Sequence, residues 1–203
     1  MITREKSFGQ DYKLSFVDKF GIELSLIRIR RAINRFDNLI SCLEIGCGYN
    51  AKLLCALLSH IKEGIGVDVS ISEEVKNTEK LKFIESPIEF AFEQLRGRSF
   101  DLILIISVLE HLNDPFLILE KSYEHLNKNG ILLVNVPTWL GKCFLEFSAY
   151  KLGLSPKAEM DDHKMYYDKK DLWPLLTKAG FKPSNINLEY HKFGLNLFCT
   201  ARK

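Results

Sequence analysis

The first regular pattern along the chain is a set of apolar residues that repeat at helical spacing. Residues spaced three or four positions apart share one face of an α-helix. Charged residues fall between them, so the pattern predicts an amphipathic helix over residues 22–36 that packs this face against the rest of the protein. The apolar positions are Ile22, Leu26, Ile29, Ile33 and Phe36.

Beyond residue 39 the pattern changes to short apolar runs that alternate with helical stretches. The run at residues 100–106 is continuous and apolar, as strands in the middle of a parallel sheet are. Strand–helix alternation at this spacing predicts a parallel sheet with helices on both faces. The expected strands span residues 40–45, 64–69, 81–84, 100–106 and 131–136, and the expected helices span residues 51–60, 114–129 and a last stretch that ends near 179.

Local signals mark the ends of the helix over residues 114–129. Asp114 followed by Pro115 predicts its start, with the aspartate as N-cap and the proline at the first helical position. Gly130 is expected to close the helix in the left-handed conformation, which glycine adopts at little cost.

The chain ends in two apolar runs with no helix between them. Residues 186–192 and 195–201 are joined by a tight turn at Gly194, so these strands must pair antiparallel. At 203 residues the chain has room for one domain. We expect a single domain over residues 1–203, with an N-terminal helical segment (1–38), a cofactor-binding core (39–136), a lid or substrate insertion (137–167), and a last helix with a β-hairpin (168–203).

The connection at residues 137–167 is much longer than the usual loop of about two to six residues. Long loops over a ligand-binding edge commonly form lids or substrate pockets. The first part, residues 139–150, is rich in aromatic side chains, and its spacing permits a helix. Three interpretations stay open: a helix packed over the sheet, a pocket for an aromatic, sugar or lipid-linked substrate, and a contact between two copies of the chain.

Composition and charge narrow the range of partners. The net charge is +2 without a basic stripe, so no nucleic-acid partner is expected. No apolar run approaches the roughly 18–20 residues of a membrane span, although Lys142, Lys151 and Lys157 permit weak contact with an anionic membrane surface. The five cysteines lack a Cys-x-x-Cys pair and suit a reducing compartment. We therefore expect a cytoplasmic protein, monomeric or homodimeric.

Residues 43–50, Leu-Glu-Ile-Gly-Cys-Gly-Tyr-Asn, lead from the first predicted strand into a helix. Glycines in such a loop let the backbone turn sharply and let a ligand approach closely. Asp68, at the end of the second strand, is placed to accept hydrogen bonds from both ribose hydroxyls of a nucleoside. Each feature alone also fits a turn former or a cap, but together they favour a nucleoside site at the carboxyl edge of the sheet.

Further motifs follow at matching intervals. They are Ser-Phe-Asp-Leu at 99–102, Leu-Glu-His-Leu-Asn-Asp-Pro at 109–115 and Leu-Asn-Lys-Asn-Gly-Ile-Leu at 126–132. With these motifs the chain resembles the class I S-adenosylmethionine-dependent methyltransferases, most closely the small-molecule branch called type 11 or type 12. The resemblance covers residues 39–137 and implies an α/β, Rossmann-like, doubly wound, mostly parallel seven-stranded sheet with a C-terminal antiparallel hairpin.

The resemblance also implies which residues bind S-adenosylmethionine and its product S-adenosylhomocysteine. Glu44 would receive hydrogen bonds from the methionine end of the cofactor, and Asp68 would hold the ribose. The other implied cofactor residues are Gly46, Cys47, Gly48, Val69, Pro87, Ile88 and Ser107.

Two positions depart from the family pattern. The third loop glycine is Asn50 here, whose side chain tolerates unusual backbone angles. Pro87 stands near the place where the family often has an aspartate that contacts the adenine amino group.

Methyl transfer from a sulfonium requires aligned reactants and no acid, because the leaving group is a neutral thioether. A hydroxyl acceptor would gain from a base with a pKa of about 7, which favours histidine. His111 follows the fourth strand at the carboxyl edge, and His163 precedes the last helix, where the resembled family often has a histidine or an aromatic residue. Both are candidate catalytic residues, although His111 fits a role in shaping the cofactor site equally well. Candidate substrate residues are Trp139, Tyr166 and Tyr167.

The run Asp161-Asp162-His163 contains residue types that bind metals. Adjacent ligands without a second cluster make a poor closed site, so no metal is expected.

The function predicted from these features is methyl transfer to a small molecule, with O-methylation of a sugar, cell-envelope or secondary metabolite as the first expectation. Two alternatives stay open. One is an NAD(P)-dependent oxidoreductase, because the glycine loop also fits the dinucleotide fingerprint. The other is a methyltransferase-like protein that binds the cofactor or a partner without catalysing a reaction.

Overall fold

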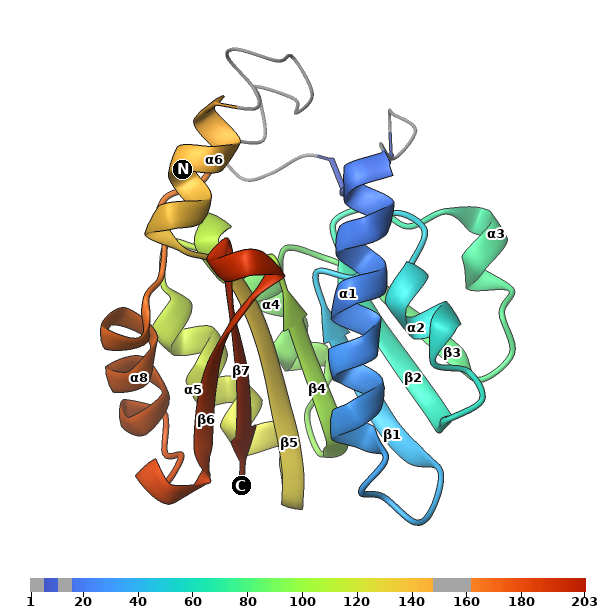
Figure 1. Cartoon of the computed structure of the whole chain (residues 1–203). Helices are drawn as coiled ribbons and strands as arrows, with labels where there is room; N and C mark the ends of the chain where they lie inside the picture. The colour runs from blue at the N-terminus through green and yellow to red at the C-terminus, as the bar shows by residue number, and fades with distance from the viewer. Residues whose placement is uncertain (1–5, 11–15, 148–161) are drawn as a thin grey trace.

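The computed structural model describes residues 6–10, 16–147 and 162–203. The strands are β1 (Ile40–Ile45), β2 (Ile61–Asp68), β3 (Leu81–Glu85), β4 (Phe100–Ile106), β5 (Leu126–Pro137), β6 (Ile186–His191) and β7 (Asn196–Arg202). They form one sheet in the order β3-β2-β1-β4-β5-β7-β6 (Figure 1). Strands β1 to β5 run parallel, and β7 pairs antiparallel with both β5 and β6. The predicted α/β sheet with a C-terminal antiparallel hairpin is confirmed.

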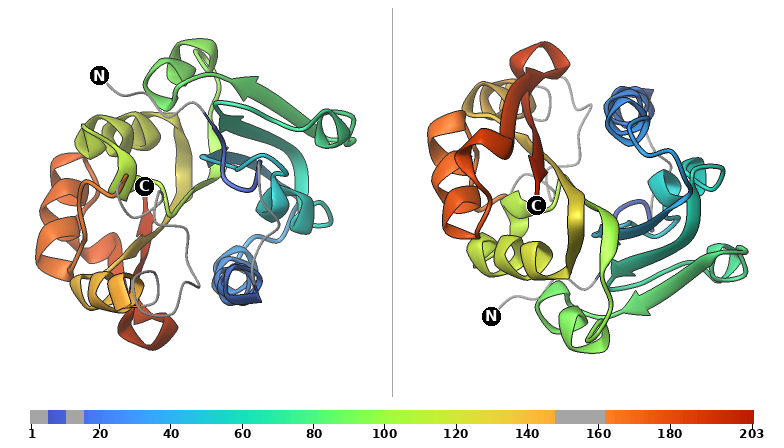
Figure 2. Two further views of the ribbon diagram at one scale, coloured as in Figure 1. Left: turned by 90° about the horizontal axis from the view of Figure 1, so that it is seen from above. Right: turned by 90° about the horizontal axis from the view of Figure 1, so that it is seen from below.

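Helices cover both faces of this sheet (Figure 2). They are α1 (Phe16–Ile33), α2 (Lys52–Ala56), α3 (Glu73–Lys76), α4 (Ile88–Gln94), α5 (Pro115–His125), α6 (Trp139–Phe147) and α8 (Lys169–Lys178). Because successive side chains of a strand point to opposite faces, the strands contribute to two hydrophobic cores. Leu43 and Ile103 pack with α4, α5 and α8, whereas Cys42 and Leu102 pack with α1 and α2.

Helix α1 buries the face that the sequence pattern predicted. Leu26, Ile29 and Ile33 are all buried against the sheet. The helix begins earlier than expected, at Phe16, and its first turns expose Phe16 and Phe20 to solvent. The sequence pattern did not predict this part of the helix, because the described residues of its first turns bury no apolar face.

Helix α2 is much shorter than the expected helix over residues 51–60. It ends at Ala56, and the chain then turns through Leu57 to His60 before it enters β2 at Ile61. Leu57 N donates to Leu54 O over 3.0 Å, which is the bond of a tightening turn and not of a continuing α-helix. His60 therefore precedes a strand and does not end a helix.

The prediction that Gly130 closes a helix is wrong. Helix α5 ends at His125 and β5 starts at the next residue, so Gly130 lies inside the strand. The residue with positive φ is Asn129, at 66°. Gly130 is required for a different reason: a Cβ there would lie 2.9 Å from Asn127 O and 3.0 Å from Phe100 O, where the β4–β5 register shifts.

The predicted start of α5 is confirmed, whereas β2 and β5 each begin earlier than expected, at Ile61 and Leu126. Asp114 caps α5 by accepting a hydrogen bond from Leu117 N over 3.1 Å, and Pro115 is the first helical residue. The β6–β7 connection is a short 3-10 turn, η4 (Lys192–Gly194). Among the described residues, no helix combines the length and the apolarity that a membrane span requires.

Candidate active site

A cavity of about 860 Å³ opens at the edge of the sheet where the parallel strands end. Residues at the ends of β1, β2 and β4 line it, together with residues of α1 and of η4. Strand β1 lies between β2 and β4, so this is the point where the order of the parallel strands reverses direction. Open α/β sheets bind their ligands at such a point.

The loop after β1 presents backbone to this cavity. Gly46 and Gly48 both have a φ of 72°, which disfavours any side chain. A Cβ on Gly46 would lie only 2.3 Å from Val108 Cγ2, so the loops after β1 and β4 touch here. The next left-handed residue is Ala51, with a φ of 42°, so the unusual backbone angle falls there and not on Asn50.

Asp68 is held in place at the end of β2 by several hydrogen bonds. Its carboxylate accepts from Gly48 N over 2.7 Å and from Val69 N over 2.8 Å. The Ser7 hydroxyl also donates to Asp68, and Ser70 N donates to the Ser7 oxygen over 2.9 Å. Residues 6–10 therefore pack over the glycine loop, and the carboxylate links this segment, the loop and β2.

Glu44 is a buried carboxylate at the end of β1 that faces the cavity. Its exposed fraction is 2%, and its Oε2 atom has no hydrogen-bond partner among the described residues. Burial raises the pKa of Glu44 well above its ordinary value, a hydrogen bond from the Leu54 backbone opposes this, and the charge of Asp68 adds to it. An unpartnered oxygen of a buried carboxylate is the acceptor that a cationic ligand group would satisfy.

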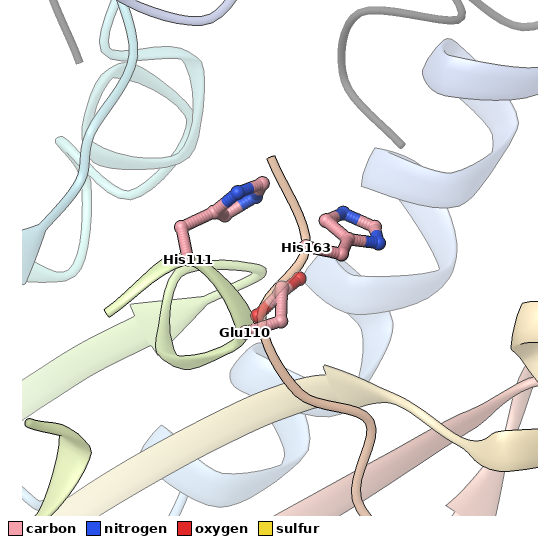
Figure 3. Close-up of side chains that lie close together, drawn as sticks. All are labelled: Glu110, His111 and His163. Atoms are coloured by element: carbon pink, nitrogen blue, oxygen red, sulfur yellow. The ribbon is translucent and has the colours of Figure 1, made fainter. Parts of the chain in front are cut away.

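Two histidines that also line the cavity come together from distant parts of the sequence. His111 belongs to the 3-10 turn η1 (Leu109–His111) after β4, and His163 precedes α8. Their rings meet edge to face with centroids 4.7 Å apart, and Figure 3 shows both beside Glu110. One candidate ligand atom from each of these three residues lies within 4.8 Å of the other two.

Backbone hydrogen bonds explain why the two segments meet. Lys164 N donates to Glu110 O over 2.7 Å, and Tyr167 N donates to Pro137 O over 3.0 Å. These bonds hold residues 164–167 along the ends of β4 and β5. His163 is thereby fixed over the turn that carries His111.

Each histidine has an oxygen beside its Nδ1 atom. Asp162 Oδ2 lies 3.0 Å from His111 Nδ1, and Tyr166 Oη lies 3.2 Å from His163 Nδ1. A carboxylate or hydroxyl in this position fixes the orientation of an imidazole and selects which nitrogen carries a proton. Tyr166 therefore orients the His163 ring through a hydrogen bond, and Asp162 lies at ion-pair distance from the His111 ring.

The architecture and this cavity can be compared with known proteins. Residues 23–185, most of the chain, match the model of a family described as a methyltransferase domain. The chain belongs to this methyltransferase family. The recognition of a class I S-adenosylmethionine-dependent methyltransferase from the sequence is thereby confirmed. The match gives no support to the alternative of an NAD(P)-dependent oxidoreductase.

Individual relatives of this methyltransferase are distant. The ubiquinone biosynthesis O-methyltransferase of Rickettsia akari is 21% identical over 83% of this chain and 69% of its own length. A protein of the same name from Chelativorans is 34% identical, but over only 51% of this chain and 42% of that protein.

Solved structures agree on the fold. A SAM-dependent methyltransferase from Archaeoglobus fulgidus superposes with a TM-score of 0.67 at 19% identity, covering 93% of this chain and 98% of that one. The N-methyltransferase NodS from Bradyrhizobium japonicum, solved with S-adenosylhomocysteine, gives a TM-score of 0.60 at 15% identity, covering 93% and 88% of the two chains.

All the residues that the resemblance assigns to cofactor binding line the same cavity. Besides Glu44, Gly46, Gly48 and Asp68, the lining includes the five remaining positions, Cys47, Val69, Pro87, Ile88 and Ser107. Burial and the charge of Glu44 raise the pKa of Cys47 well above its ordinary value, so this residue is a neutral thiol in the methyltransferase. His111 and His163 line the same cavity.

The three predicted substrate residues do not line the cavity. Tyr167 is a core residue, 1% exposed, and its hydroxyl donates to Leu109 O over 3.3 Å. Tyr166 is also buried, and its ring packs between those of His163 and Trp139. The ring centroids of Tyr166 and Trp139 are 5.7 Å apart. The sequence placed these aromatic residues near the right edge of the sheet, but it could not tell which side chains turn inward. Residues 148–161 of the insertion, including Lys151 and Lys157, lie outside the described residues.

Three cavity residues of the methyltransferase were missed as site residues. Glu110 is 2% exposed, and a charged residue inside the apolar run Val-Leu-Glu-His-Leu was the signal that marked it. Asp162 was considered only as a metal ligand, and nothing in the sequence pairs it with His111. Lys192 reaches the cavity from η4, where burial lowers its pKa to about 8 against the opposing charge of Glu110. No sequence signal marked Lys192, because it lies at the end of an ordinary strand pattern.

Proposed function

We propose that this methyltransferase transfers a methyl group from S-adenosylmethionine to a hydroxyl group of a small molecule. One cavity is lined both by the glycine loop and Asp68, after β1 and β2, and by the two histidines, one of them just after β4, and this observation carries the proposal. A donor bound along the loop would therefore have its methyl group facing the histidines.

The residues present fit S-adenosylmethionine. Glu44 would accept hydrogen bonds from the ammonium group of the methionine portion through its Oε2 atom, which has no partner among the described residues. Asp68 would hold the ribose hydroxyls, which requires the Ser7 hydroxyl to yield its place on the carboxylate. Gly46, Cys47 and Gly48 would lie against the cofactor, Val69, Pro87 and Ile88 would enclose the adenine, and Ser107 would face the methionine portion.

Methyl transfer mainly requires the protein to align the acceptor oxygen, the methyl carbon and the sulfur atom. The acceptor oxygen forms a bond to the methyl carbon while the carbon–sulfur bond breaks, and the electron pair leaves on sulfur as a neutral thioether. The hydroxyl proton must also leave, and His111 and His163 are the groups we propose to assist it. Asp162 and Tyr166 would act as positioning residues, because each adjoins the Nδ1 atom of one ring.

The form of the cavity supports an acceptor with an apolar body and a hydroxyl group. Phe20, Phe144 and Phe193 line the cavity and expose much of their surface. Several curated relatives are ubiquinone biosynthesis O-methyltransferases, whose name indicates a ring-bearing acceptor methylated on oxygen.

Two measurements test the proposal. S-adenosylhomocysteine, but not NAD⁺, should raise the melting temperature of the protein, and stabilisation by NAD⁺ alone would contradict the cofactor assignment. Incubation with methyl-labelled S-adenosylmethionine and a metabolite extract should then place label on an oxygen atom of a small molecule. Cofactor binding without any labelled product would favour the alternative of a binding protein that catalyses nothing.

A further inference from the structure

A second chemistry is available where the two histidines meet. We propose that Glu110, His111 and His163 bind one divalent transition-metal ion at the acceptor end of the cavity. Their candidate ligand atoms lie within 4.8 Å of one another, and Figure 3 shows the three side chains gathered from two segments of the chain. A role of the ion in activating the acceptor rests on the proposed function, but binding of the ion does not.

The fold supplies what the sequence lacked. The run Asp161-Asp162-His163 argued against a metal because no second group of ligands accompanied it. Glu110 and His111 are that group, and the Lys164–Glu110 backbone hydrogen bond of 2.7 Å brings them to His163. Asp161 lies outside the described residues, and the proposal does not need it.

The donor set suits a transition metal. Two imidazoles and a carboxylate are ligands that Zn²⁺, Fe²⁺ and Co²⁺ accept, with metal–ligand distances of about 2.0–2.2 Å. Such distances place neighbouring ligand atoms roughly 3.0–3.5 Å apart. The most distant of these atoms, up to 4.8 Å apart, would therefore need to approach by about 1.3–1.8 Å around an ion, a movement that side-chain rotation can supply.

The neighbours of the histidines are those of metal ligands. A histidine that binds a metal usually has its other ring nitrogen against a carboxylate, a hydroxyl or a carbonyl. Asp162 Oδ2 stands 3.0 Å from His111 Nδ1, and Tyr166 Oη stands 3.2 Å from His163 Nδ1. We therefore assign Nε2 of each ring to the ion. This observation is independent of the spacing of the three ligands.

The charge balance also favours a cation here. Glu110 is 2% exposed, and burying a carboxylate is costly unless positive charge is close. Lys192 interacts electrostatically with Glu110 and supplies part of that charge. A divalent ion bound by Glu110 would compete with Lys192 for the same carboxylate, so the two cations should oppose each other.

An ion at this position would act on the acceptor. A hydroxyl group bound to a divalent ion loses its proton far more readily than a free one. The bound oxygen would then attack the methyl carbon, the thioether would leave with the carbon–sulfur electrons, and the released proton would pass to solvent. In that state His111 and His163 serve as ligands, and the ion takes over the acidification of the hydroxyl group.

Titration with Co²⁺ tests the site directly. The full chain is stripped with EDTA and titrated while the visible d–d absorption is followed. We expect a band that saturates at one ion per chain, without the intense near-ultraviolet absorption that a Cys47 thiolate ligand would add. A signal that never saturates near one equivalent, or one with thiolate character, would overturn the proposal.

Matched variants identify the ligands. His163→Ala should weaken Co²⁺ binding more than tenfold, whereas His60→Gln, at the opposite edge of the sheet, should leave it unchanged. Lys192→Met should tighten binding several-fold, because it removes the competing charge. Equal Co²⁺ affinity in wild type and His163→Ala would overturn this ligand set, and equal affinity in wild type and Lys192→Met would overturn the competition for Glu110, provided the melting temperature shows a folded protein.

S-adenosylhomocysteine binding is measured on the same samples. If Co²⁺ fails to bind while S-adenosylhomocysteine binds normally, the metal site is refuted and the proposed function stands. If S-adenosylhomocysteine fails to bind, the proposed function is refuted whatever the metal does.

Discussion

Replacing Glu44 by glutamine should have opposite effects on the free protein and on its complex with S-adenosylhomocysteine. In the free protein the carboxyl group is 2% exposed, its Oε2 atom has no hydrogen-bond partner in the described part of the chain, and burial raises its pKa. In the complex that oxygen would accept hydrogen bonds from the cofactor's ammonium group. Glu44→Gln keeps the size and the acceptor for the Leu54 amide but removes the negative charge.

The loss on binding follows from the strength of hydrogen bonds to charged groups, about 1.5–3 kcal/mol each. At about 1.4 kcal/mol per factor of ten, the variant should bind S-adenosylhomocysteine roughly 10- to 150-fold more weakly. Without ligand, Glu44→Gln should be as stable as wild type or up to about 2 kcal/mol more stable, because the substitution removes a buried charge that lacks a full set of partners.

The pH dependence has a definite sign. A carboxyl group whose pKa is raised by folding stabilises the folded state below its unfolded pKa and loses that contribution as pH rises through the folded pKa. The stability of wild type relative to Glu44→Gln should therefore fall as pH increases from about 4.5. Urea unfolding of both proteins across this range measures the difference.

Isothermal titration with S-adenosylhomocysteine and urea unfolding of the unliganded protein are the two assays. Glu79→Gln is the matched control, since Glu79 is an exposed carboxylate before β3 and should change neither result. Unchanged cofactor affinity in Glu44→Gln would refute the assignment of Glu44. A free protein destabilised by several kcal/mol would refute the reasoning about its buried charge.

Three further predictions follow from the same contacts. Asp68→Asn should weaken S-adenosylhomocysteine binding at least tenfold by calorimetry, because it removes the negative charge and replaces one of the two acceptor oxygens with an NH2 donor; equal affinity would remove Asp68 from the ribose site. Gly46→Ala should lower the free energy of unfolding by about 2–4 kcal/mol in urea, because its Cβ would lie 2.3 Å from Val108 Cγ2 at a φ of 72°; wild-type stability would show that the loop is not constrained. Burial raises the pKa of Asp101, but hydrogen bonds from Ser41 and neighbouring groups outweigh it and hold the pKa below its ordinary value. Asp101→Asn should therefore cost about 1 kcal/mol near neutral pH, and the difference should vanish as pH falls through the folded pKa; a constant difference down to acid pH would contradict this.

The sheet could be predicted well from the sequence because its strands are continuous apolar runs buried on both faces. The run at residues 100–106 became β4 with the same bounds. The cofactor end of the cavity was predictable for a related reason: Gly46, Gly48 and Asp68 lie within a short distance of strand ends, and their geometry is local. No packing information was needed to place them at one edge.

Other features depend on contacts that the sequence does not display. Gly130 follows a helix as a terminator would, but the close approach of the Phe100 carbonyl determines its role. His111 and His163 converge only because residues 164–167 hydrogen-bond along the ends of β4 and β5. Tyr167 looked like a substrate residue because of its position near this edge, yet its side chain fills the core.

The central claim is that one cavity holds the methyl donor along the glycine loop with its reactive end toward His111 and His163. A crystal structure with S-adenosylhomocysteine tests it most directly. We expect the ribose hydroxyls about 3 Å from the Asp68 carboxylate, the amino group near Glu44, and the sulfur atom facing the two histidines. A nucleoside bound elsewhere, or one whose sulfur faces away from the histidines, would contradict the account.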